Sequence, residues 1–371
     1  MKRPLLLLLY LTSLLAMGQD YSFSQFDLNL MYSNPAFAGY ENNDRVLFHR
    51  KNQWVGIAEK FNSNIIEINM SQELRRPGLG QGRVMWSGGI YLIEDHENTV
   101  IKKYQIGIVP WSFHYQFPDN FFLSLGIKNV ISYNTLNWDN LIFSDEIDEF
   151  GLTGEQTSAT PPYYLKYTNW FDPSFGFILT KHSQYQKKTN QTTHLGFSID
   201  HLNGVVQGFY NNQNERSRQP LKYTIHAEHL GSIPDFLSKN FRYWKIFLRN
   251  EMMRLNGEEK NIIQKDEFGL STTLSNKLQI ELGTVYRIGR NYQEDNNRIM
   301  SESIIPILRI RLKASQKIGM EIGYSYDFNI SELENKNAIA TNEININFYF
   351  IKSKKSICPA NGKWKSNKKF K

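Results

Sequence analysis

The chain has 371 residues, a formal net charge of +7, a mean hydropathy of −0.48 and a single cysteine. No segment approaches the ~18 consecutive apolar residues of a spanning helix, so a helical membrane protein is excluded. One cysteine also excludes an internal disulfide, and stability must come from packing and backbone pairing. The length fits either two soluble domains or one large β-barrel.

The N-terminus has the pattern of a secretory signal. Lys2 and Arg3 precede an apolar stretch from Leu5 to Ala16, and Ala16-Met17-Gly18 is a small-residue cleavage pattern. The alternative, an N-terminal anchor helix, needs a longer apolar stretch. We therefore expect residues 1–18 to be a cleaved signal peptide and the mature protein to be exported.

Fourteen segments follow in which apolar and polar residues alternate or β-forming residues are concentrated. We expect strands at 44–51, 63–72, 85–94, 103–116, 121–132, 173–180, 193–201, 221–230, 243–254, 264–274, 277–287, 301–313, 316–327 and 341–351. In the thirteenth, Ile318, Met320 and Ile322 fall on one face, whereas Gly319 and Glu321 fall on the other. In a bilayer we expect Met320→Arg to cost about 2–4 kcal/mol and Glu321→Gln to cost little.

Either a soluble sheet or a transmembrane barrel uses such alternation, and the lengths of the segments favour the barrel. Many segments reach ten residues or more, which suits a tilted span of hydrocarbon better than a sandwich strand of about five or six residues. Links are tight near 118–120, 275–276 and 314–315, long at 133–172, 202–220, 288–300 and 328–340, and longer than this alternation predicts at 73–84, 181–192 and 231–242. We predict an all-β fold, a transmembrane antiparallel β-barrel of about 14 strands and of outer-membrane type, over residues 44–351.

An ordered set of short motifs spans almost the whole mature chain. They are Phe23-Ser24-Gln25-Phe26, Tyr32-Ser33-Asn34-Pro35-Ala36-Phe37-Ala38-Gly39, Arg50 with Asn52-Gln53-Trp54-Val55-Gly56, His194-Leu195-Gly196-Phe197-Ser198 with His201-Leu202, Gly323-Tyr324-Ser325-Tyr326-Asp327, Asn342-Glu343-Ile344 and Cys358-Pro359. This set resembles the PorP/SprF family, outer-membrane proteins of the type IX secretion and gliding machinery. The stretch Glu59-Lys60-Phe61-Asn62 departs from the family's proline-containing turn, which affects the expected first outer loop and not the fold.

The resemblance implies a fourteen-stranded barrel in the cell outer membrane that helps to export or anchor a secreted surface protein. Such cargo, typified by the adhesins of gliding cells, carries a type-B C-terminal secretion signal. The family is also linked to the periplasmic ring and to peptidoglycan-associated components of the machine. A diffusion pore or small-solute transporter is the alternative function, because a barrel of this size can be open or plugged.

The resemblance also supplies the candidate partner-binding residues. They are Gln25, Asn34, Pro35, Ala36, Gly39, Arg50, Gln53, Trp54, Tyr326, Asp327, Cys358 and Pro359. Asn34, Pro35 and Gly39 are typical of a turn. This turn is either structural, as a plug or as the lead-in to the first strand, or it is a periplasmic surface that binds a partner. We expect residues 19–43 to be a periplasmic N-terminal segment.

Two further candidates lie at the end of the first strand and in the link that follows it. Arg50 either pairs with a carboxylate inside the barrel or binds a partner at the outer rim. Trp54 is either an interfacial anchor or part of the same binding surface.

Other chemistry finds little support in the sequence. A strand places His226 and Glu228 on one face and His229 on the other, which does not supply the ligand set of a zinc site. No nucleophile elbow or other spaced catalytic motif is present, so we expect no enzyme activity, no metal and no cofactor.

Two segments outside the strands are candidates for binding. Residues 352–371 contain eight lysines and no acidic residue, and we expect a basic periplasmic tail that is disordered or contacts acidic lipid headgroups. Nucleic acid is an implausible partner for an exported chain, and Cys358 either remains a thiol or cross-links to another protein. The link 133–172 combines aromatic and acidic side chains, so it forms either a cargo-binding loop or a solvated lid.

Overall fold

In the computed structural model the chain is described between residues 21 and 351. The ranges outside the description are 1–20, 29, 42, 56–60, 75–82, 98–99, 118–119, 150, 155, 163–164, 186–188, 206–208, 210–217, 234–240, 255–261, 275–277, 294–295, 314, 316, 331–339 and 352–371. The expected signal peptide, the lysine-rich tail, Cys358 and Pro359 therefore lie outside the described residues.

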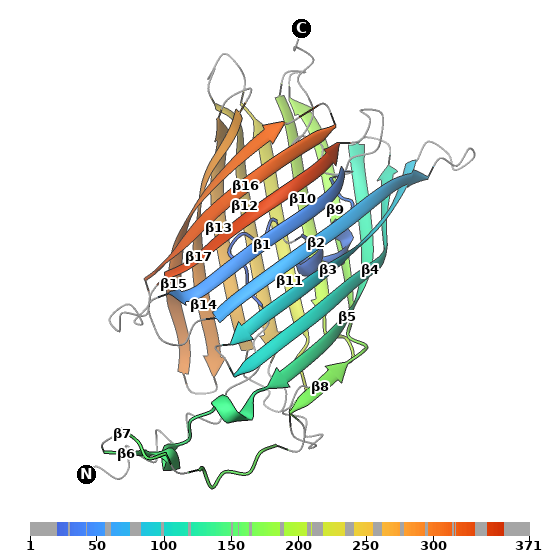
Figure 1. The fold of residues 1–371 in the computed structure, drawn as a ribbon. Helices are drawn as coiled ribbons and strands as arrows, with labels where there is room; N and C mark the ends of the chain where they lie inside the picture. The colour runs from blue at the N-terminus through green and yellow to red at the C-terminus, as the bar shows by residue number, and fades with distance from the viewer. Residues whose placement is uncertain are drawn as a thin grey trace.

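Fourteen antiparallel strands close into a barrel (Figure 1). They are β1 (Asn43–Val55), β2 (Phe61–Leu74), β3 (Arg83–Glu97), β4 (Ile101–Phe117), β5 (Phe121–Leu136), β9 (Pro173–Tyr185), β10 (Thr189–Asp200), β11 (Lys222–Ser232), β12 (Phe241–Arg254), β13 (Ile262–Leu274), β14 (Leu278–Gln293), β15 (Asn296–Lys313), β16 (Ile318–Asn329) and β17 (Ala340–Ile351). Each pairs with its neighbour around the barrel, and β1 closes the sheet against β17 from Asn43 opposite Ile351 to Val55 opposite Ala340. The predicted barrel and its strand number are confirmed, and closure leaves no unpaired edge for lipid to face.

The two faces of the strands divide as the alternation predicts. On β16, the apolar residues Ile318 and Ile322 are 40% and 39% exposed on the outer surface. Their neighbours Gly319, Glu321 and Gly323 are buried on the inner side. The outer wall is therefore apolar and the inner wall is polar, which is the arrangement of a membrane barrel and the reverse of a soluble one.

The two ends of the barrel differ in their connections. We call the end at which β1 begins and β17 ends the N/C end. The links that join strands at this end are 75–82, 118–120, 186–188, 233–240, 275–277 and 314–317. At the opposite loop end, the longest links are 137–172, 201–221 and 330–339. The expected long link 288–300 is wrong, because β14 and β15 remain paired as far as Gln293 opposite Asn296.

The longest link carries short elements of its own beyond the loop end of the barrel (Figure 1). They are η4 (Trp138–Asn140), η5 (Ser144–Glu146), the hairpin of β6 (Ile147–Asp148) and β7 (Gly151–Leu152), and β8 (Lys166–Asn169), which extends the sheet beside β5. Asp145 fixes this loop by accepting hydrogen bonds from the Ser158 backbone and hydroxyl and from the Thr157 hydroxyl.

The chain before β1 runs inside the barrel, and we call residues 21–41 the plug. It contains α2 (Leu30–Ser33) and η2 (Pro35–Phe37), and nearly all of its described side chains are buried. The sequence places 19–43 on the periplasmic side of the barrel, whereas the described part of this segment occupies the lumen. The physical reason is that its apolar and polar side chains both find partners on the inner wall. None of the helices in the described part of the chain is long and apolar enough to cross a membrane.

Candidate functional site in the barrel lumen

The plug is held first by a capped turn at its centre. The Asn34 side chain accepts a hydrogen bond of 2.9 Å from the Ala36 N–H and so begins η2, with Pro35 at the first position. The Asn34 amide also donates to the carbonyl oxygens of Phe177 and Phe197, at 3.3 and 3.1 Å. Asn34 thus joins the plug to β9 and β10, and the predicted turn is a plug element.

Glycines on the wall make room for this turn. A Cβ on Gly126 would lie 2.4 Å from the backbone of Pro35, and a Cβ on Gly176 would lie 2.0 Å from the Asn34 side chain. Any larger residue at either position would therefore push the plug away from the wall.

A second close contact holds the plug against β3 and β4. Gly39 has φ +67°, and a Cβ there would lie 2.4 Å from that of Ser87, so glycine is required on both counts. The Ser87 hydroxyl donates to the Ala38 carbonyl at 2.6 Å, and His114 lies 2.8 Å from the same oxygen.

Buried charge fixes the first half of the plug. Asp27 accepts two hydrogen bonds of 2.6 Å from the Arg309 guanidinium and one of 2.7 Å from Lys245. Glu281 lies between the same two cations, 2.9 Å from Lys245 and 3.4 Å from Arg309. Because all four groups are buried, each charge depends on the others for its stability.

A second polar cluster lies where the plug meets β1, β16 and β17. Glu343 accepts hydrogen bonds from the Ser24 and Gln25 backbone N–H groups at 2.7 and 3.1 Å. The Ser24 hydroxyl donates to Asp327 at 2.6 Å, and Arg287 binds the same carboxylate at 2.9 Å. The plug therefore supplies hydrogen-bond partners that the wall needs.

The structure brings together only some of the candidate residues. Gln25, Asn34, Pro35, Ala36, Gly39 and Asp327 all lie buried inside the barrel, in separate contacts around the plug, whereas Arg50, Gln53, Trp54 and Tyr326 do not join them. Arg50 lies exposed on the outer wall and donates to Asn52 at 3.1 Å, so the first of its two alternatives, an internal ion pair, is wrong. Trp54 lies within β1 at φ +59°, beside a register shift, with its ring 4.8 Å from that of Phe61.

Sequence reasoning missed the partners of the plug on the wall. Lys245, Glu281, Arg287 and Arg309 stand on polar faces of predicted strands, but alternation shows only that they point inward. The signal available was the mixture of opposite charges on adjacent polar walls, such as Glu281 opposite Arg309 in the β14–β15 register. That pattern predicts ion pairs but does not indicate a plug.

The His226-Ala227-Glu228-His229 stretch is divided by its strand as expected. His226 is buried beside the plug, with Nε2 3.1 Å from the Asn34 amide, whereas His229 bonds to Thr193. Among the described residues, no group of three or more His, Cys, Asp or Glu side chains is arranged to hold a metal ion. The arrangement as a whole is suited to closing a lumen.

Comparison with known proteins identifies the chain's relatives. The family profile described as "Type IX secretion system membrane protein PorP/SprF" matches residues 16–348. No curated protein matches the sequence.

The solved structures that resemble this chain include outer-membrane barrels, some of them channels. A TodX mutant described as a monoaromatic hydrocarbon channel is 10% identical at a TM-score of 0.44, covering 89% of this chain and 94% of its own. A FadL homologue of Pseudomonas aeruginosa is 9% identical at a TM-score of 0.43, covering 86% of this chain and 93% of its own. The translocator domain of NalP from Neisseria meningitidis is 10% identical at a TM-score of 0.35, covering 88% of this chain and 96% of its own. We draw no functional conclusion from likeness at this level.

Proposed function

Because the chain belongs to the PorP/SprF family of type IX secretion system membrane proteins, we propose that it is a non-enzymatic outer-membrane component of that machinery. In this proposal it assists export or surface attachment of one secreted, adhesin-like protein with a type-B C-terminal signal. Its other partners are the periplasmic ring, peptidoglycan-associated components and membrane lipid. The N/C end faces the periplasm and the loop end faces the exterior, since long loops of such barrels are extracellular.

The observation that carries the proposal is the plugged lumen. The plug is bound to the wall by hydrogen bonds from strands on several sides of the barrel, and its Asp27 carboxylate is matched by buried Arg309 and Lys245. A diffusion pore needs an open aqueous path, so this arrangement favours a binding role over solute transport. The pore remains the second candidate, because barrels of this size can conduct once a plug leaves.

The loop end offers a surface on which cargo can bind. Residues 137–165 of the longest link contain six acidic residues and no lysine or arginine. In this loop Ile142, Ile147 and Leu152 are 60%, 52% and 67% exposed. Apolar contact area surrounded by a single sign of charge suits a basic partner, since the charge steers association and the apolar groups supply affinity.

A deletion strain tests the proposal. Without the gene, one large protein should disappear from the cell surface while other type IX cargo is still exported. A variant lacking residues 140–160 should still fold as a barrel, judged by its gel migration, but should retain less of the same cargo. If the surface proteome of the deletion strain matched the parent and only solute uptake fell, the transporter would replace this proposal.

A further inference from the structure

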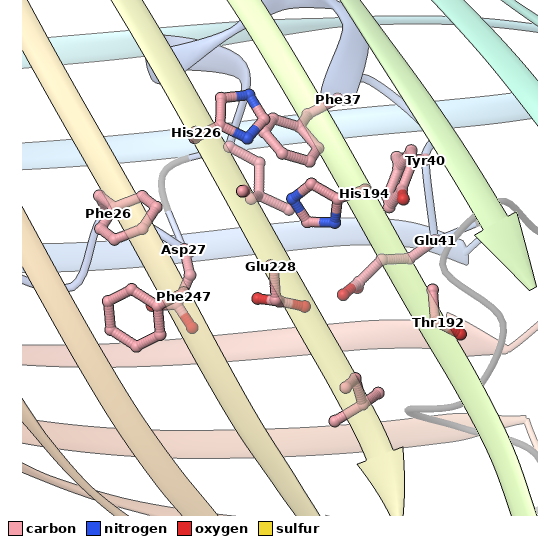
Figure 2. Close-up of a pocket in the computed structure, with 13 residues that line it drawn as sticks. Phe26, Asp27, Phe37, Tyr40, Glu41, Thr192, His194, His226, Glu228 and Phe247 are labelled. Carbon is pink, nitrogen blue, oxygen red and sulfur yellow. The ribbon is translucent and has the colours of Figure 1, made fainter.

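A pocket lies between the plug and the inner face of β10, β11 and β12 (Figure 2). The plug forms one side with Phe26, Phe37 and Tyr40, and Phe247 of β12 adds a fourth ring. Thr192 and Leu230, also in the lining, stand close to the ends of β10 and β11 at the N/C end. The pocket therefore belongs to that half of the barrel.

The charge of this pocket is one-sided. Asp27, Glu41 and Glu228 line it, and none of the described residues in its lining is a lysine or an arginine. The carboxylates of Glu41 and Glu228 point into the same space (Figure 2). Asp27 is already bound by Arg309 and Lys245. Within the described part of the chain, the half-buried Glu228 makes no hydrogen bond and no ion pair within 4 Å, although its charge interacts with the buried Lys245.

A buried histidine borders the same space. His226 is 3% exposed, and its Nε2 lies 3.1 Å from the Asn34 amide nitrogen, which also donates to the Phe177 and Phe197 carbonyls. Its ring stacks on that of Phe37, with the two ring centroids 4.9 Å apart. His226 therefore extends the aromatic side of the pocket.

We propose that this pocket binds a lysine or arginine side chain of a polypeptide segment that enters from the N/C end. The cation would pair with Glu228, and its alkyl stem would pack on the rings of Phe37 and Tyr40. Aromatic faces beside a carboxylate favour such cations over neutral groups. Only the assignment of this end to the periplasm rests on the proposed function; the binding itself does not.

Two sources can supply such a segment. The chain's own residues 352–371 follow β17 at the N/C end and carry eight lysines without an acidic residue. Extended, 20 residues reach roughly 65–70 Å, more than enough to cross the mouth of a barrel of this size. The other source is a basic segment of a separate periplasmic protein.

The probe is a labelled synthetic peptide with the sequence of residues 352–371, titrated against purified barrels in detergent. The barrels are the wild type and a tail-neutral variant, a full-length chain in which the eight tail lysines are replaced by glutamine. Glu228→Gln is introduced into each. Glu94→Gln, which removes a half-exposed carboxylate of β3 outside the acidic loop, is the matched control.

The peptide should bind the tail-neutral barrel, and Glu228→Gln should weaken binding by about 10- to 100-fold, the loss expected for one charge-assisted hydrogen bond. If the peptide binds the tail-neutral barrel tightly and the wild type only weakly, the chain's own tail already occupies the wild-type pocket. Equal binding to both assigns the site to a segment of another protein. Absence of binding, or equal effects of Glu228→Gln and Glu94→Gln, would overturn the proposal. Because the assay uses purified protein, its outcome is independent of the cargo experiment.

Discussion

Asp27→Asn should loosen the plug without unfolding the barrel. Asp27 accepts two hydrogen bonds from Arg309 and one from Lys245, all of them buried. Removing one partner of a buried ion pair costs about 3–5 kcal/mol. Arg309 keeps Gln25 at 3.2 Å, and Lys245 keeps Glu281 at 2.9 Å, so we expect the lower limit, about 3 kcal/mol. Since about 1.4 kcal/mol is tenfold, local opening of the plug should increase about 100-fold.

Amide hydrogen exchange in detergent micelles measures this opening directly. Amides of the plug should exchange about 100-fold faster in Asp27→Asn, while those of the strands remain protected. Asp139→Asn, an exposed carboxylate in η4, is the control and should leave every region unchanged. If plug amides in Asp27→Asn exchanged at the wild-type rate, the ion pairs would not be what holds the plug.

Four further outcomes follow from the same structure. The unboiled protein should migrate faster on a gel than the boiled protein, because a closed barrel resists detergent, and equal migration would contradict the barrel. Met320→Arg on the outer wall should cost about 2–4 kcal/mol in a denaturant titration in lipid. The sequence alone predicts Glu321→Gln to be mild. Because Glu321 pairs with buried Arg311, we expect this change to cost about 3 kcal/mol of unfolding free energy. A neutral result would contradict that pair. Hydrogen bonds from Ser158 and Thr157 lower the pKa of Asp145 to about 2. The stability that these bonds give the loop is therefore complete at pH values above the ordinary pKa of 3.8, and it is lost as the pH falls through about 2. Exchange of the Ser158 amide, corrected for its intrinsic rate, should rise over that range in the wild type and show no such step in Asp145→Asn.

The barrel was predictable because lipid and a polar lumen impose one pattern on every strand. Each expected strand overlaps an observed one, and the alternation at Ile318, Glu321 and Ile322 shows the correct faces. Strand ends were less predictable. The link 288–300 contains polar residues typical of loops, yet the ladder of β14 and β15 extends through it, because strands projecting beyond the membrane no longer need an apolar face.

The site was only half predictable. Asn34, Pro35 and Gly39 show turn chemistry in the sequence, but turn chemistry does not reveal which side of the barrel the turn occupies. Its position depends on partners far away in the chain, such as Arg309 for Asp27 and Glu343 for the Ser24 N–H. Alternation on single strands contains no information about such pairings across the lumen.

Single-channel recording in planar bilayers tests the central claim, that residues 21–41 close the lumen, most directly. The wild-type protein should insert without a steady ionic current, and Asp27→Asn should show brief openings. A stable, ohmic open-pore current from the wild type would contradict the plugged barrel and support a diffusion pore instead.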